Sequence, residues 1–421
     1  MVSFAGDALG LYISIPFCRS KCTYCNFASG VYPASEHESY VARLIEDLRA
    51  APDWAEQIGA EVPRRVDTVY LGGGTPSLLA PELIARLFGA MRAEFDLEPD
   101  AEITVECAPG QVGDETLNAL VAAGVNRVSF GVQSFIDREA AVSGRLHNRA
   151  VVLNDIDRLR AAGIADLSID LIAGLAGQTF ASWEESLAVL VDSDVPHASV
   201  YMLEVDQDSR LGREMLTHGA RYHADLVPTD DAIAQMYSVA IERLGKAGLE
   251  QYEISNFSRR GMRSRHNLRY WLRRPYLGIG LDASSMLHET HEMGDASKPC
   301  RVLRATTTDD LQAYLAGSEA AVTTWINPEQ RHEEAWFLGL RLNAGVEIAA
   351  VEQEFGPAPV ALALQAVARL VDAGLLISDG QTVRLTQRGR LLSNEVFQEF
   401  LGLRPEPGLA ANVETGSKTI A

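Results

Sequence analysis

The chain has 421 residues, with 37 Lys and Arg against 57 Asp and Glu, a formal net charge of -20 and 47% hydrophobic residues. These values are typical of a soluble globular protein with more than one domain. So acidic a chain has no general attraction to nucleic-acid phosphates or to an anionic membrane. No segment approaches the roughly 18 apolar residues of a membrane span, and Met1–Gly10 lacks the pattern of a signal peptide. We therefore expect a cytoplasmic protein that does not bind nucleic acid.

Six short apolar segments alternate with amphipathic stretches in the first half of the chain. They are Leu11–Ile15, Val66–Leu71, Glu102–Glu106, Arg127–Gly131, Leu167–Ile172 and Ala198–Leu203. Strands that alternate with helices predict repeated βα units and a parallel sheet. Six units predict an α/β fold in which the sheet curls into a partial (β/α)6 barrel. Such barrels carry their chemistry on the loops at the C-terminal ends of the strands.

Local signals place several helix ends. Ser35, followed by Glu38, reads as a capping box at the start of the first helix. Gly124 and Gly163 each follow an Ala-Ala pair, where a left-handed helix end is expected. Asp230–Gly248 reads as one long helix that stops at its glycine.

The pattern divides the chain into five segments. They are a short N-terminal segment (1–10), the barrel (11–226), a mixed C-terminal region (227–330), a winged-helix-like unit (331–403) and a disordered tail (404–421). The winged-helix-like prediction rests on helices through Leu340 and over Ala361–Ala373, followed by a hairpin around Asp379-Gly380. Such units often bind DNA, but on this acidic chain a packing or partner-binding role is favoured.

Three of the five cysteines, Cys18, Cys22 and Cys25, lie directly after the first predicted strand. Three thiolates on one short loop can ligate three irons of a cubane and leave the fourth iron open to another ligand. The alternative is a structural zinc site, which requires four protein ligands. No fourth Cys or His stands at finger spacing, since His37 falls inside the first predicted helix. The spacing therefore favours a [4Fe-4S] cluster.

This CxxxCxxC segment after the first strand of a βα barrel resembles the signature of the radical S-adenosylmethionine (SAM) superfamily. The resemblance implies that the open iron chelates SAM and that an electron from the cluster cleaves the sulfonium to a 5'-deoxyadenosyl radical. It also implies an electron donor such as a flavodoxin or ferredoxin.

Glycines and polar residues at the other strand ends are candidates for binding SAM. Gly73, Gly74 and Thr75 follow the second strand, where the superfamily has a glycine motif that binds SAM through its backbone. Five further residues are expected to line the same cavity: Tyr12, Glu106, Gln133, Arg145 and Asp170. For any one of them alone, a structural role is the alternative.

Beyond the barrel, the resemblance narrows to the branch with oxygen-independent coproporphyrinogen dehydrogenases and the HemW group of heme chaperones. Segments that carry it include Tyr12–Cys18, Gly131–Phe135, Asp170–Gly174 and Tyr252–Phe257. His266–Trp271 matches the HNxxYW motif of the chaperone group. We interpret His266 as a heme iron ligand beside two aromatic faces, with packing of this segment on the barrel mouth as the alternative.

The dehydrogenases carry a further cysteine two places after the third cluster ligand, and here that place is Phe27. They also carry an N-terminal extension, whereas this chain has Met1–Gly10 before its first strand. A phenyl ring can neither donate a hydrogen atom nor act as a thiolate, although Cys107 at a neighbouring strand end is a candidate substitute. We therefore expect heme binding without formation of protoporphyrinogen.

The resulting hypothesis is a heme chaperone that passes heme to acceptor apoproteins, including respiratory enzymes at the membrane, where the protein itself can be peripheral. Three alternatives stay open. They are a coproporphyrinogen III dehydrogenase, a radical SAM enzyme that methylates or opens heme, and a regulatory protein that uses its winged-helix-like end.

Overall fold

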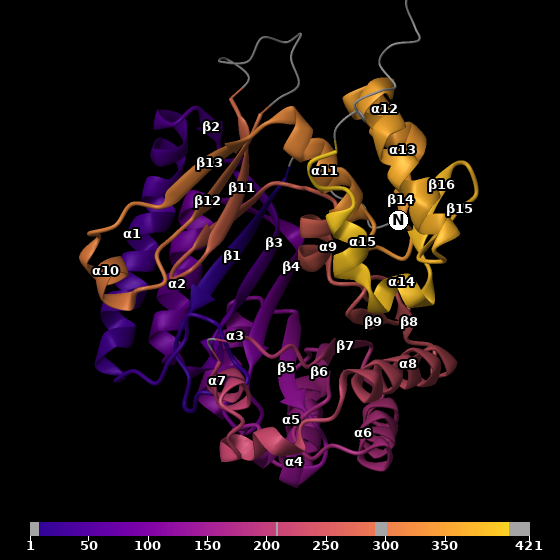
Figure 1. The fold of residues 1–421 in the computed structure, drawn as a ribbon. Helices are drawn as coiled ribbons and strands as arrows, with labels where there is room; N and C mark the ends of the chain where they lie inside the picture. The colour runs from indigo at the N-terminus through magenta and orange to yellow at the C-terminus, as the bar shows by residue number, and fades with distance from the viewer. Residues whose placement is uncertain (1–7, 208, 291–300, 404–421) are drawn as a thin grey trace, which may run out of the picture. The chain divides into compact units, whose positions relative to one another are not determined.

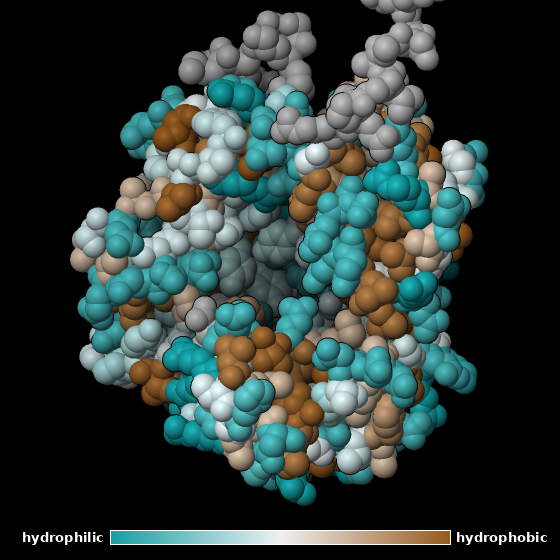
Figure 2. Space-filling view, viewed as in Figure 1, coloured by the Kyte–Doolittle hydropathy of each residue, from teal (hydrophilic) through white to brown (hydrophobic). Residues whose placement is uncertain are grey.

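The computed structural model describes residues 8–207, 209–290 and 301–403, and Figure 1 shows its fold. The chain forms two compact units, one of residues 1–270 and 274–326 and the other of residues 271–273 and 327–421. No helix in the described part is long and apolar enough to cross a membrane. Hydrophilic residues dominate the face shown in Figure 2, with hydrophobic residues in scattered groups. The tail 404–421, predicted above to be disordered, lies outside the described residues, as does the fifth cysteine, Cys300.

The larger unit is built on parallel strands in the order β1-β3-β4-β5-β6-β7. Their bounds are β1 Leu9–Ile15, β3 Arg65–Gly73, β4 Asp96–Cys107, β5 Arg127–Gln133, β6 Asp166–Ala173 and β7 His197–Met202. All six predicted strands are therefore confirmed, within a few residues at their ends. In the register, Ile15 pairs with Gly73 and Cys107 with Phe130, so these C-terminal ends meet at one edge.

Further strands extend this sheet on both sides. Their bounds are β2 Ala60–Glu61, β8 Glu250–Gln251, β9 Asn256–Ser258, β10 Tyr276–Ile279, β11 Ser284–Glu289, β12 Val302–Thr306 and β13 Val322–Ile326. β10 runs parallel to β1, whereas β9 runs antiparallel to β7. In the described residues the outermost strands, β13 and β8, do not pair with each other. The sheet is thus an open, partial barrel, which confirms the predicted class.

Helices follow the strands and cover the sheet, as Figure 1 shows for α1, α2 and α6. The helices of this unit are α1 Ser35–Gln57, α2 Pro81–Glu94, α3 Asp114–Ala122, α4 Asp137–Val142, α5 Arg149–Ala161, α6 Phe180–Asp192, α7 Arg210–Leu216, α8 Asp230–Lys246, α9 Arg265–Trp271 and α10 Leu311–Ala316. Short 3-10 helices span η1 Pro76–Leu78 and η2 Arg221–Leu226.

The helix-end predictions have different outcomes. Gly124 and Gly163 have φ of 85° and 92°, so both left-handed helix ends are confirmed, and Gly248 has φ of 81° after α8. The capping box at Ser35 is wrong, because α1 begins at that residue after Ala34 and has no side-chain cap. Its buried apolar side chains, such as Tyr40 and Leu44, hold α1 on the sheet instead.

The second unit contains five helices and a small antiparallel sheet in its described residues. Its elements are α11 Pro328–Gly339, β14 Val346–Glu347, α12 Ile348–Phe355, α13 Pro357–Asp372, β15 Leu376–Ser378, β16 Thr382–Leu385, α14 Gln387–Leu391 and α15 Ser393–Gln398. The strand order is β14-β16-β15. Helices followed by a hairpin and further helices are the winged-helix-like arrangement predicted above.

The predicted boundary near residue 226 does not coincide with the boundary between the two units. Strands β8 to β13, which follow that residue, join the same sheet as β1. The five-segment division of the chain therefore stays a prediction.

Candidate functional site

The three clustered cysteines lie on a loop that leaves β1 and returns to its end. The backbone N–H of Cys18 donates to the carbonyl of Gly30 at 2.8 Å, and Gly30 N–H donates to Pro16 at 2.9 Å. The Lys21 ammonium crosses this loop and donates to the carbonyls of Phe27 and Ser29 at 2.6 and 2.8 Å. We call residues 18–30 the cluster loop. Its ends and its middle are therefore fixed by hydrogen bonds.

The thiols of this loop differ in their surroundings. Cys22 is buried, and the guanidinium of Arg145 lies 3.5 Å from its sulfur. The Ser29 hydroxyl lies 4.0 Å from the sulfur of Cys25. Burial raises the pKa of the Cys18 thiol, which hydrogen bonds from Ser29 and Thr75 oppose. Positive charge and hydroxyl donors near sulfur favour the thiolate form that a metal requires.

In the described residues, no three Cys, His, Asp or Glu side chains converge as they would around one metal ion. A cubane takes each thiolate on a different iron, so its ligands stand further apart than those of a single zinc ion. The donor set of three thiols on one loop therefore fits a [4Fe-4S] cluster.

The glycine turn after β3 lies against this loop. The N–H groups of Gly74 and Thr75 donate to the carbonyls of Ile15 and Phe17 at 2.8 and 2.7 Å. A Cβ on Gly74 would lie only 2.7 Å from the Phe17 carbonyl oxygen, and Gly73 has φ of 99°. Both positions therefore require glycine, which brings the backbone close to the cluster loop.

Two half-buried carboxyl groups face the strand ends. Glu106 on β4 accepts from the Tyr70 hydroxyl at 2.7 Å and from Gly73 N–H at 3.2 Å. Burial raises its pKa to about 7. Asp170 on β6 accepts from the Ser129 hydroxyl at 3.2 Å, and burial raises its pKa to about 6. Each carboxyl thus keeps acceptor capacity for a polar ligand.

Gln133 and Arg145 complete the polar group at this edge. Gln133 ends β5 with φ of 70°, and its buried side-chain oxygen has no hydrogen-bond partner. A buried acceptor without a partner is costly unless a ligand satisfies it. Arg145 donates to the Gly131 carbonyl as well as approaching Cys22. The unpartnered amide oxygen of Gln133 and the nearby guanidinium of Arg145 together fit a polar cofactor that has both donors and acceptors.

Tyr12 is half-buried on β1, with its ring stacked on Tyr70 at 6.1 Å between centroids. Burial raises the pKa of its hydroxyl, with a smaller contribution from the negative charge of Glu106. Tyr12 therefore stays neutral and belongs to the wall of this group. The structure thus brings together the predicted residues of the strand ends, from Tyr12 to Asp170.

His266 lies toward the amino-terminal ends of the strands, with its ring stacked on Tyr70 at 5.2 Å between centroids. It is fully buried, its Nδ1 lies 3.0 Å from the Thr68 hydroxyl and its Nε2 lies 2.9 Å from the Tyr270 hydroxyl. Burial lowers its pKa to about 3. The ring has no free nitrogen for an iron in this conformation, so its role as a heme ligand stays a prediction that the geometry does not favour.

The helix that carries His266 closes the amino-terminal side of the sheet. The carboxylate of Glu102 accepts from the N–H groups of Arg265 and His266 at 2.8 and 2.9 Å. The buried guanidinium of Arg269 pairs with Asp67 and donates to the Ala8 carbonyl at 2.7 Å. The alternative of packing on the barrel mouth is therefore corrected, since this segment packs at the opposite end from the cluster loop.

Sequence reasoning missed several residues that complete the site. Tyr70 and Ser129, which bond the two carboxyls, alternate with apolar residues along their strands and gave only a strand signal. Lys21 lies between the cysteines and Ser29 follows them, but the contacts of both side chains depend on how the cluster loop folds back.

The thiol of Cys107 is unsuited to replace a missing cysteine on the cluster loop. It is 4% exposed, and burial raises its pKa to about 12. A thiol that is neutral and enclosed behaves as a small apolar side chain. Phe27, in contrast, is 63% exposed on the cluster loop.

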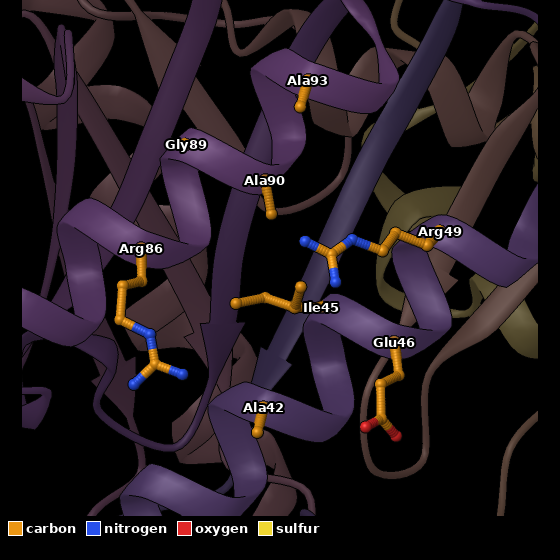
Figure 3. A pocket seen from close by; sticks show the side chains of 8 residues that line it. All are labelled: Ala42, Ile45, Glu46, Arg49, Arg86, Gly89, Ala90 and Ala93. Carbon is orange, nitrogen blue, oxygen red and sulfur yellow. The ribbon is translucent and has the colours of Figure 1, made fainter.

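A separate groove lies on the helix layer, between α1 and α2. Figure 3 shows its lining, in which Arg49 and Arg86 flank small side chains such as Ala90. Arg86 pairs with Glu38, and Arg49 lies 3.7 Å from the carboxylate of Glu94. This groove holds no nucleophile or free cation and lies on helices, away from the strand ends.

The second unit shows no basic recognition helix. The charged residues of α13 are Arg369 and Asp372, and Arg369 pairs with Glu399 at 3.2 Å. DNA-binding helices present several cations to phosphates. Helix α13 therefore lacks the basic surface that a DNA-binding regulatory protein would require.

Comparison with known proteins gives the class of this fold and site. Residues 12–190 match the model of the Radical SAM superfamily, and residues 326–392 match that of the HemN C-terminal domain. The solved structure of coproporphyrinogen III oxidase (HemN) from Escherichia coli superposes with a TM-score of 0.76, at 23% identity over 94% of this chain and 90% of that one. The partial barrel with its three-cysteine loop thus defines a radical SAM protein, a class that implies a [4Fe-4S] cluster and SAM.

Relatives along the whole chain narrow the class to one family. Heme chaperone HemW of Lactococcus lactis is 32% identical over 93% of this chain and 96% of its own length. HemW of Bacillus subtilis is 32% identical over 93% and 98%, and HemW of Mycobacterium tuberculosis is 33% identical over 94% and 96%. The chain belongs to the HemW family of heme chaperones.

Proposed function

We propose that this protein binds heme, holds it beside a radical SAM centre and delivers it to acceptor apoproteins. Its relatives that carry the name heme chaperone match it over nearly the whole length of both chains. The single observation that carries the choice of chaperone over dehydrogenase is the exposed phenyl ring of Phe27, which stands where the dehydrogenases carry a cysteine.

Cys18, Cys22 and Cys25 would hold the cluster, and the strand ends would hold SAM. Bound together, the cluster and SAM supply a one-electron route to an organic radical. The backbone of Gly73, Gly74 and Thr75 offers close polar contact to the amino acid part of SAM.

The polar side chains at the strand ends would orient SAM. The carboxylates of Glu106 and Asp170 accept hydrogen bonds from hydroxyl groups, and the free amide oxygen of Gln133 accepts a further one. Arg145 balances negative charge beside Cys22, and Tyr12 forms an aromatic wall.

Two classes of protein partner follow from this proposal. The cluster needs an electron donor, for which a flavodoxin or a ferredoxin is suited. Heme delivery needs acceptor apoproteins, and heme enzymes of the respiratory chain at the membrane are the acceptors that we propose.

Two enzymatic alternatives involve the same cofactors. Oxidative decarboxylation of coproporphyrinogen III would require the thiol step that Phe27 and the enclosed Cys107 do not supply. Methylation or opening of heme would require the macrocycle to meet the radical at the barrel mouth. Both reactions change the porphyrin, whereas a chaperone releases it intact.

One anaerobic incubation distinguishes these functions. Reconstituted protein with SAM and a reductant is given heme or coproporphyrinogen III, and the tetrapyrroles are then extracted and identified. The proposal predicts that the protein binds heme stoichiometrically and that this heme is recovered unchanged. Coproporphyrinogen III should also be recovered unchanged. Accumulation of protoporphyrinogen, or of a modified heme, would overturn it.

The ligand assignment has its own test. Changing Cys18, Cys22 or Cys25 to Ala exposes a second iron and destabilises the cubane. Each variant should lose its iron and sulfide, and with them the broad absorbance at about 400 nm that such clusters show. The enclosed Cys107→Ala is the matched control and should keep both. Full iron and sulfide in a ligand variant would refute the assignment.

A further inference from the structure

The histidines of the described chain differ in whether their rings are engaged. His197 and His266 have both ring nitrogens in hydrogen bonds, and the ring nitrogen of His332 accepts from Trp336. His147 is buried against the Val132 carbonyl, and the ring of His37 stacks on Phe17. His288 is half-buried and has an interaction partner, and His37, though half-buried, lies with its ring face against Phe17. A heme iron needs a nitrogen with a free lone pair, which the buried and hydrogen-bonded rings do not present at the surface.

His218 and His223 are different. Both are exposed, and within the described residues neither ring takes part in a hydrogen bond, ion pair or ring contact. They lie five residues apart on one short segment, Arg210–Leu226, which consists of α7, a turn and η2. We call this segment the histidine lobe.

The histidine lobe begins on the cluster loop. Leu211 N–H donates to the Thr23 carbonyl at 2.8 Å, and the Arg210 guanidinium donates to the Lys21 carbonyl at 3.4 Å. Since α7 has seven residues, its length is about 10 Å, and His218 follows two residues after its end. The exposed imidazoles are therefore carried on the same side of the barrel as the cysteines.

The remaining side chains of the lobe suit a flat apolar macrocycle with two carboxylates. Leu216 and Leu226 are 61% and 44% exposed. The guanidinium of Arg221 lies 4.9 Å from the ring centre of Tyr222. Exposed leucines offer contact to a porphyrin face, while an arginine at the surface offers a charged partner for propionates.

The backbone of the lobe is strained at the same positions. His218, Tyr222 and His223 have φ of 54°, 60° and 56°, a left-handed conformation that side chains with a Cβ adopt at a cost. Non-glycine residues in this region cluster at ligand sites, where the strain is part of the function.

Building on the proposed function, we infer that the histidine lobe is the heme-binding element and that His218 or His223 ligates the iron. The two rings share one short segment, so one of them binds at a time and the opposite face of the iron stays open. An exposed, single imidazole ligand suits a carrier that must release its heme intact.

The test uses the full chain with its cluster reconstituted. Hemin is titrated into the wild type, His218→Ala, His223→Ala, the double variant and His266→Ala, with Thr217→Ala on the same lobe as the matched control. Absorbance gives the affinity, and electron paramagnetic resonance gives the axial ligand. Iron, sulfide and SAM binding are measured on every sample to verify the fold.

The inference predicts that the double variant binds hemin at least about tenfold more weakly and loses the histidine-ligated spectrum, and that free imidazole restores this spectrum. Thr217→Ala and His266→Ala should retain the spectrum of the wild type. An unchanged spectrum and affinity in the double variant would overturn the lobe assignment, as would loss of the spectrum in a folded His266→Ala alone. Failure of the wild type to bind hemin would instead refute the proposed function.

Discussion

Lys21 and Ser29 set the environment of the thiols at the residue scale. The hydroxyl of Ser29 reaches toward Cys25, and the Lys21 ammonium lies between the carbonyls of Phe27 and Ser29. Hydrogen bonds and positive charge near cluster sulfurs stabilise the more negative, reduced state, so they raise the reduction potential.

We therefore predict that Ser29→Ala lowers the midpoint potential of the cluster, because a hydroxyl donor near two thiolates is lost. Redox titration followed by electron paramagnetic resonance measures the change, and Ser20→Ala on the same loop is the control. If both variants titrate together with the wild type, Ser29 does not act on the cluster.

Glu106 gives a second prediction at this scale, on pH. Its pKa is 4.5 without perturbation and rises to about 7 because burial disfavours the ionised form. The native state therefore binds more protons than the unfolded state between these values. This contribution to stability is fully present below pH 4.5 and is lost as the pH rises through about 7.

Urea unfolding of the cluster-free protein at several pH values between about 4.5 and 7.5 measures this contribution. The free energy of unfolding of the wild type should fall more steeply with rising pH than that of Glu106→Gln, which cannot ionise. If the free energies of unfolding of the wild type and Glu106→Gln change in parallel with pH, ionisation of Glu106 is not the cause of the pH dependence.

At the scale of elements, helix α9 is held on the sheet by a buried ion pair. Its Arg269 is fully buried, pairs with buried Asp67 and donates to the carbonyls of Ala8 and Pro275. Gly10 is required beside it, because a Cβ there would lie 2.5 Å from the Arg269 side chain. The arginine therefore ties α9 to the start of β1 and to β3.

Removing one partner of a buried ion pair leaves an uncompensated charge. Arg269→Met should accordingly lower the free energy of unfolding by about 3 to 5 kcal/mol. Lys246→Met, which breaks the exposed pair with Glu242 on α8, should leave the free energy of unfolding almost unchanged, because solvent screens that pair. Similar small losses for both variants in denaturant titrations would show that α9 is not held by this pair.

Sequence patterns predicted the parallel strands well, because each βα unit is encoded by local periodicity. They predicted the cysteine loop and the strand-end residues for the same reason, since the position after a strand fixes the edge of the sheet. The region from Gly248 to Asn327 was not assignable, because its strands are short and pair with distant partners. His266 was misplaced for a related reason: its burial depends on Thr68 and Tyr70, which lie on a predicted strand but far from His266 in the sequence.

At the scale of the whole molecule, a radical SAM barrel is proposed to serve a protein that carries heme. The barrel supplies the cluster loop and the strand ends that we propose bind SAM, and the family relation covers nearly the full chain. The proposed distinction from porphyrin-forming enzymes depends on the exposed phenyl ring of Phe27 and on the enclosed thiol of Cys107.

The most direct measurement is therefore heme transfer. Heme-loaded protein and an apoprotein acceptor are mixed in one compartment, under reducing, anaerobic conditions with SAM. The two proteins are then separated, and the absorbance and heme content of the acceptor are measured over time. The account predicts that the acceptor gains stoichiometric, chemically unchanged heme faster than it does from free heme at the same concentration. No gain over free heme, or recovery of an altered tetrapyrrole, would contradict it.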